Sequence, residues 1–105
     1  MKILAVDTTA SPVSAALMDD GRLLGEIFLN IHTTHSQTLM PAISSLLSNT
    51  GVKADEIDIF AVNSGPGSFT GVRIGVASVK GMAMPFEKPC AGVSTLDAMA
   101  YGVPF

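Results

Sequence analysis

Three short apolar segments joined by tight turns open the chain, and they constrain its fold more than any other feature. Residues 2–9 (KILAVDTT), 13–18 (VSAALM) and 22–30 (RLLGEIFLN) each have the length and composition of a strand, and the Asp-Asp-Gly at 19–21 is a turn that hairpins use. Consecutive strands joined in this way pair antiparallel. The chain is therefore predicted to begin with a three-stranded antiparallel sheet.

The hydrophobic period then changes from that of strands to that of helices. The elements predicted next are a helix from residue 34 or 35 to 48, a strand at 57–63, a helix from 68 or 70 to about 84, a strand at 90–93 and a helix that begins at 94. The order β-β-β-α-β-α-β-α predicts an α/β fold, a mixed five-stranded sheet with helices on its faces. This is the order of a ribonuclease-H-like lobe of the actin-like ATPase superfamily.

The composition indicates that this chain buries a surface against something else. Its 105 residues suffice for one domain, and 48 % of them are hydrophobic whereas only 14 % are charged, well below the roughly 25 % of an average soluble domain. We infer either a partner or a place in a longer protein. The net charge of −3 argues against direct binding of nucleic acid, which requires clustered cations.

The cellular compartment is predicted from two absences in the sequence. A single cysteine, Cys90, cannot form an internal disulfide, which suits a reducing compartment. Asp7 interrupts the opening apolar run before the core of a signal peptide is reached, and no run approaches the roughly 18 apolar residues of a membrane helix. We expect a cytoplasmic protein without membrane contact.

Two segments have the composition of a phosphate site, and for both a structural role is favoured. A cofactor-binding role stays open for a set of small and polar residues: Asp7, Thr8, Thr9, Gly65, Gly67 and Ser68. The glycines match neither a P-loop nor a dinucleotide fingerprint, although a helix N-terminus after glycines can bind an anion. Turn formation by Asp7 and capping by Ser68 account for the same residues, so we expect no cofactor.

Metal and nucleophile chemistry lack the necessary residues. His32 and His35 do not share a helix face, and no third ligand accompanies them, so no metal site is expected. Ser68 has no evident general base and acid. The sequence accordingly predicts no catalytic residue and no enzyme activity.

Glycines at four-residue spacing mark the second predicted helix. Gly71 and Gly75 each cost about 1 kcal/mol relative to Ala in a helix interior, so a close contact should offset them. Spacing alone fits equally a contact with the chain's own sheet and one with a partner helix. The apolar excess of the whole chain favours the partner.

Four blocks, in order, resemble the TsaB (YeaZ) family of tRNA threonylcarbamoyladenosine biosynthesis proteins. They are ILAVDTT, HSQTLMP (35–41), GPGSFTGVRIG (65–75) and GVSTLDAMA (92–100). The resemblance covers essentially the whole chain, and it implies a glycoprotease-like, non-catalytic scaffold for a TsaD-like threonylcarbamoyltransferase. Members are about twice as long, so residues 1–105 are expected to be a single N-terminal lobe that lacks the second one.

The resemblance also implies partners and a docking face. A TsaE-like ATPase is the further partner, tRNA is contacted only through the complex, and the chain forms a homodimer through its two long helices when the transferase is absent. Helical spacing assigns this face to His35, Leu39, Ile43, Leu47, Gly71, Val72, Arg73, Gly75, Val76 and Lys80. The alternative function is a nucleotide-binding ATPase-type lobe of the actin and sugar-kinase superfamily. A metalloprotease is excluded because metal ligands are lacking.

Overall fold

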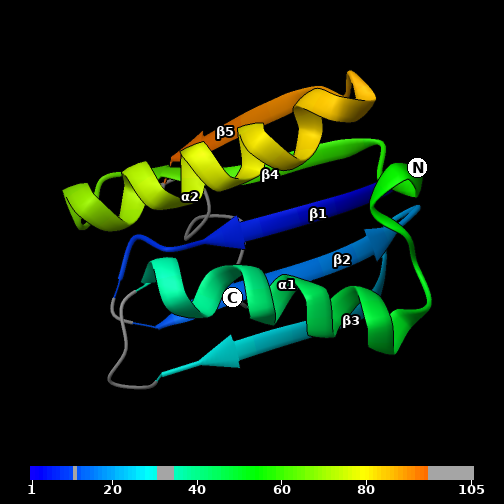
Figure 1. Ribbon diagram of the computed structural model, residues 1–105, viewed down its shortest axis with the longest axis horizontal. Coiled ribbons are helices and arrows are strands. Elements are labelled where there is room, and N and C mark those ends of the chain that lie inside the picture. Colours follow the sequence, from blue (N-terminus) through cyan, green and yellow to red (C-terminus); the bar gives the residue numbers. More distant parts are fainter. Residues whose placement is uncertain (11, 31–34, 95–105) are drawn as a thin grey trace, which may run out of the picture.

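The structure is a five-stranded mixed sheet with two helices on one face (Figure 1). The computed structural model describes residues 1–10, 12–30 and 35–94. The strands are β1 (Lys2–Asp7), β2 (Val13–Asp19), β3 (Arg22–Leu29), β4 (Ile59–Gly65) and β5 (Cys90–Ser94). Their order in the sheet is β3-β2-β1-β4-β5; β1, β2 and β3 pair antiparallel, and β4 and β5 run parallel to β1. The predicted fold class is confirmed.

The hairpin between β2 and β3 forms at the predicted turn. Asp19 pairs with Arg22, so the connecting loop is the dipeptide Asp20-Gly21. Both residues have positive φ, 50° and 80°, as the commonest two-residue hairpin loops require. The Asp-Gly sequence therefore sets the register of this strand pair.

Two helices cover the same face of the sheet (Figure 1). α1 (His35–Thr50) packs on β2 and β3, and α2 (Phe69–Ala83) packs mainly on β4, with contacts to β1 and β5. Both were predicted to within two residues at each end. Short 3-10 helices at Ala54–Glu56 and Met84–Phe86 were not predicted. The third predicted helix lies outside the described residues.

The core lies between the sheet and the helix layer. Alternate residues of the strands and one side of each helix supply it: Leu4, Val6, Val13, Ala15, Leu17, Leu39, Ile43, Leu46, Phe60, Val62, Val79 and Ala83 are all buried. Period-2 alternation in the strands and helical spacing in α1 and α2 thus meet in one layer. Among the described residues no helix is long and apolar enough to span a membrane.

β1 occupies the centre of the sheet and joins its antiparallel and parallel halves. At the start of the β1–β4 pair, the backbone N–H of Lys2 donates to Oδ2 of Asp58 at 2.8 Å, and the N–H of Asp58 donates to the carbonyl of Lys2 at 2.8 Å. The first of these bonds is the main cause of a lowered pKa of Asp58. At the other end, β1 and β4 both finish beside the candidate site.

Candidate functional site

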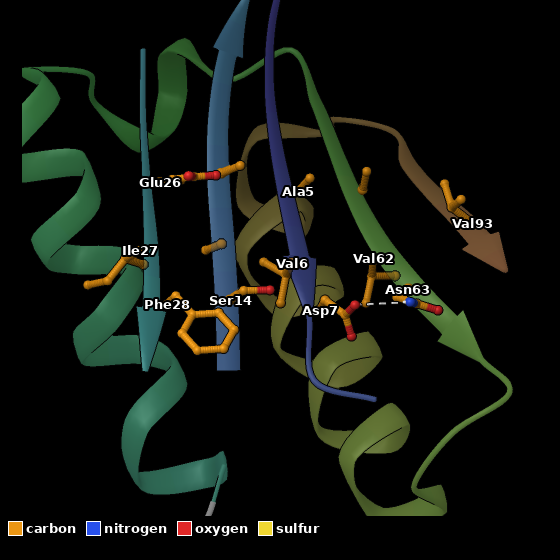
Figure 2. A pocket seen from close by; sticks show the side chains of 13 residues that line it. Ala5, Val6, Asp7, Ser14, Glu26, Ile27, Phe28, Val62, Asn63 and Val93 are labelled. Atoms are coloured by element: carbon orange, nitrogen blue, oxygen red, sulfur yellow. Dashed lines mark hydrogen bonds between the residues drawn. The ribbon is translucent and has the colours of Figure 1, made fainter. Parts of the chain in front are cut away.

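Asp7, the last residue of β1, anchors the turn that follows it. Its Oδ1 accepts hydrogen bonds from the backbone N–H and the hydroxyl of Thr9, at 2.9 and 2.7 Å, and its Oδ2 accepts one from Nδ2 of Asn63 at 3.1 Å. Figure 2 shows Asp7 and Asn63 side by side at the ends of their strands. Asn63 in turn accepts from the N–H of Gly65 at 3.0 Å. The carboxylate therefore joins the ends of β1 and β4.

The glycine loop between β4 and α2 lies directly on this turn. The N–H of Ser68 donates to the carbonyl of Thr9 at 2.7 Å, and a Cβ on Gly67 would lie only 2.6 Å from Cβ of Thr9. Glycine is needed at this position because a side chain has no room. Ser68 Oγ accepts the N–H of Gly71 at 3.2 Å, which confirms that Ser68 is the N-cap of α2.

Thr8 fastens the first turn of α2 to β1. Its side chain is fully buried, and its hydroxyl donates to the carbonyl of Gly71 at 2.6 Å. A Cβ on Gly71 would collide with the carbonyl oxygen of Thr8, and one on Gly75 would collide with its Oγ1. Both glycines thus permit a close contact within the chain. The hypothesis that they make room for a partner's helix is wrong.

The six candidates for phosphate binding are brought together, and the polar side chains among them form hydrogen bonds within the chain. The hydroxyls of Thr8 and Thr9 donate to Gly71 and Asp7, and Ser68 caps its own helix. This arrangement stiffens the junction of β1, β4 and α2. A nucleotide role for these residues stays a prediction.

A hollow of about 580 Å³ lies on the sheet face opposite the helices, next to Asp7 (Figure 2). Its floor is a row of small residues across three strands, since Ala16 pairs with Ala5 and Ala5 with Ala61. Glu26 stands at the β3 end of the row, opposite Ala16. Asp7 and Glu26 are the charged residues among those that line the hollow.

The predicted docking residues divide into two sets. Leu39, Ile43, Gly71 and Gly75 are buried against the chain's own sheet, so their assignment to an outward face is wrong. Each helix buries one side in the core of the chain, and the spacing of apolar residues in the sequence identifies that buried side. Arg73 and Lys80 are exposed, whereas Leu47, Val72 and Val76 are half-buried. The side chain of His35 lies outside the described part.

Two residues near these sites escaped the sequence analysis. Asn63 links Asp7 to the glycine loop, and a polar residue next to a strand end was its signal. Phe69 is 74 % exposed, and the Arg73 guanidinium carbon lies 5.4 Å from its ring centroid, within the range of a cation–π contact. The available sign in the sequence was a Phe directly after the predicted N-cap, Ser68.

Within residues 1–10, 12–30 and 35–94, no three His, Cys, Asp or Glu side chains gather where they would hold a metal ion. The predicted His pair cannot be compared with the structure, because the side chains of His32 and His35 are outside the described part.

Comparison with known proteins identifies the family of the chain. Residues 23–105 match the family model described as TsaD, tRNA N6-adenosine threonylcarbamoyltransferase. The chain belongs to this family. It is 41 % identical over 102 residues to the tRNA threonylcarbamoyladenosine biosynthesis protein TsaB of Escherichia coli, a match that covers 97 % of the chain and 44 % of that protein. The resemblance to TsaB is confirmed.

Solved structures agree with the sequence comparison. YeaZ from Pseudomonas aeruginosa superposes with a TM-score of 0.86 at 37 % identity, over 94 % of the chain and 45 % of YeaZ. RuvC of Thermus thermophilus, with a TM-score of 0.62 at 12 % identity over 94 % of the chain and 67 % of RuvC, shares the ribonuclease-H-like fold alone. The chain spans less than half the length of TsaB and YeaZ.

Proposed function

We propose that the chain is the N-terminal lobe of a non-catalytic subunit in tRNA threonylcarbamoyladenosine biosynthesis, which docks on a TsaD-like transferase and supports it. In this proposal the TsaE-like ATPase and tRNA meet the chain within the complex. The same helix layer pairs two copies when the transferase is absent. Support comes from the match to TsaB over nearly the whole chain. The hydrogen bonds that Asp7 forms with Thr9 and Asn63 within the chain also support a structural role for this carboxylate.

The observation that carries the docking proposal is the outward side of α2. Phe69, Arg73, Ala77, Lys80 and Met84 are all exposed, and Phe69 and Met84 are each 74 % exposed. Their spacing places them within one quarter of the helix circumference, on the side opposite the buried Gly71 and Gly75. We call this set the outward stripe. Aromatic, methionine and arginine side chains together on one exposed side of a helix are the residue types enriched at protein interfaces.

The test is co-purification of the chain with the TsaD-like transferase of the same organism. Ala77→Trp adds bulk at the centre of the outward stripe, and Leu23→Trp adds it on the exposed edge strand β3. We expect the wild-type chain and Leu23→Trp to retain the transferase and Ala77→Trp to lose it, with unchanged circular dichroism. If both variants still co-purified with the transferase, the docking surface would lie elsewhere. If the wild-type chain did not co-purify with it, docking itself would be refuted.

The nucleotide-binding lobe remains the second candidate because of one observation. The turn after β1 and the loop after β4 meet at the carboxyl ends of adjacent parallel strands, where open α/β sheets bind ligands. Calorimetric titration with ATP tests it. Heat that is lost in Asp7→Asn, which keeps the size of the side chain, would favour this candidate, and absence of heat in the wild-type chain would end it.

A further inference from the structure

The charge on the helix layer is of one sign. α1 has no charged residue, and the only charges of α2 are Arg73 and Lys80. Both are exposed within the outward stripe, and neither has an ion-pair partner in the described part of the chain. Lys2 and Lys88, by contrast, pair with Asp19 and Asp58 at the far end of the sheet. A net negative chain thus presents a positive stripe whose cations have no ion-pair partner among residues 1–10, 12–30 and 35–94.

The two cations also have a defined spacing. Arg73 and Lys80 are seven positions apart in the sequence, which places their Cα atoms about 10 Å apart along a helix that rises 1.5 Å per residue. The ring of Phe69 lies under the Arg73 guanidinium and restricts where that side chain points. Exposed apolar groups at both ends, Phe69 and Met84, frame the pair. Such a mixture of apolar and cationic groups fits a protein surface better than a nucleic-acid backbone, which offers phosphates without apolar contact.

Pairing of two copies through this stripe would bring like charges together. A two-fold axis across α2 places the stripes antiparallel, so that Arg73 of one copy faces Lys80 or Arg73 of the other. Neither helix contributes a carboxylate to compensate. Like charges juxtaposed across an interface oppose binding.

We propose that the outward stripe recognises a protein surface that is apolar and carries carboxylates, and that Arg73 and Lys80 bias the chain toward this partner and against a second copy of itself. The inference rests on the proposed docking function and adds the chemistry of the partner. The transferase surface that faces α2 is then acidic as well as apolar. Repulsion between the two positive stripes of a homodimer and attraction to carboxylates on the transferase would then both favour the complex over the homodimer.

A salt series on the wild-type chain tests both halves of this inference. Raising NaCl from about 0.1 M to about 1 M shortens the Debye length from about 10 Å to about 3 Å. Binding to the transferase, measured by calorimetry, is expected to weaken. Self-association, measured by analytical ultracentrifugation, is expected to strengthen over the same range, because screening removes repulsion. If added salt weakened both transferase binding and self-association, or strengthened both, the proposal would be overturned.

Charge reversal provides the second test. Arg73→Glu with Lys80→Glu is expected to weaken transferase binding at least about tenfold at low salt. A mixture of this double variant with the wild-type chain should form mixed dimers more tightly than either chain pairs with itself. The control, Arg22→Glu with Lys53→Glu, makes the same change in net charge at exposed positions outside the helices and should bind as the wild type does.

The outcomes separate this inference from the docking function. A wild-type chain that does not bind the transferase refutes both. A wild-type chain that binds, together with a double variant that binds equally well, refutes the charge inference and leaves docking intact. Equal weakening by the control would show a long-range effect of net charge and refute recognition by the stripe. Mixed dimers no tighter than the parents would refute the bias against self-pairing.

Discussion

α1 and α2 lie on the same face of one sheet, but they are attached in different ways. α1 reaches the strands with long side chains, Leu39, Ile43 and Leu46, which fill the space between helix and sheet. α2 reaches β1 without side chains, because Gly71 and Gly75 bring its backbone against Thr8. The contact of α1 depends on side chains that fill space, and the contact of α2 depends on positions that have no side chain.

This difference decides how each helix tolerates change. A cavity under α1 removes apolar contacts but leaves the backbone where it is. Any added atom under α2 must push the helix away from β1 or displace Thr8, and the interior has little room for either. The close attachment also fixes the position from which the outward stripe presents its side chains. Three substitutions measure the contrast, and their expected effects decrease in turn.

Gly75→Leu should have the largest effect. The new side chain would start against Thr8 Oγ1 and 3.3 Å from Cγ2 of Val62. We expect loss of cooperative folding, that is, loss of most of the roughly 5–15 kcal/mol that stabilises a domain. Urea unfolding followed by circular dichroism measures it. The control is Gly81→Leu in the same helix, where nothing lies within 4 Å and a better helix former should raise the midpoint. Similar midpoints for both would contradict the close contact.

Ile43→Ala should have an intermediate effect. Ile43 is 1 % exposed under α1, and truncation of such a residue costs about 2–5 kcal/mol. The chain should still fold, with a lower midpoint in urea. Ser44→Ala, one residue along the helix and exposed, serves as the control and should change stability little. If Ile43→Ala lowered the free energy of unfolding no more than Ser44→Ala does, the packing of Ile43 would not hold α1 on the sheet.

Thr8→Val should have the smallest effect. The substitution keeps the shape and removes the hydroxyl that donates to Gly71, and a hydrogen bond of this kind contributes roughly 1 kcal/mol. Thr8→Ser keeps the hydroxyl and removes only the methyl group. If the bond fastens α2, hydrogen exchange in the first turn of α2 should quicken in Thr8→Val more than in Thr8→Ser. Equal exchange in the two variants would assign the attachment to the glycines alone.

The sequence predicts most of the fold because each element carries its own local signal. The length and apolar composition of β1, β2 and β4, the Asp-Gly turn, and the helical spacing in α1 and α2 locate the elements to within a few residues. The order of the elements then predicts a mixed sheet. The 3-10 helices at Ala54–Glu56 and Met84–Phe86 have no comparable period and were missed.

The site was predicted less well because the roles of its residues depend on contacts with residues far away in the sequence. Gly71 and Gly75 fit a contact with any close backbone, and nothing local indicates that this backbone is Thr8, more than sixty residues earlier. The apolar spacing of Leu39 and Ile43 reports burial but does not say whether a partner or the chain's own sheet covers them. Arg73 and Lys80 are exposed, and their assignment to the docking face stays a prediction.

The central position of β1 bears on how the chain is made. β1 is synthesised before both of its neighbours, and its second neighbour, β4, ends at Gly65. While the ribosome adds about 5–20 residues per second, β2 and β3 can pair on one side and leave the other edge of β1 unpaired for seconds. An unpaired edge is a template for pairing with another chain. The order of synthesis thus gives this sheet an interval of exposure to aggregation that the finished structure does not show.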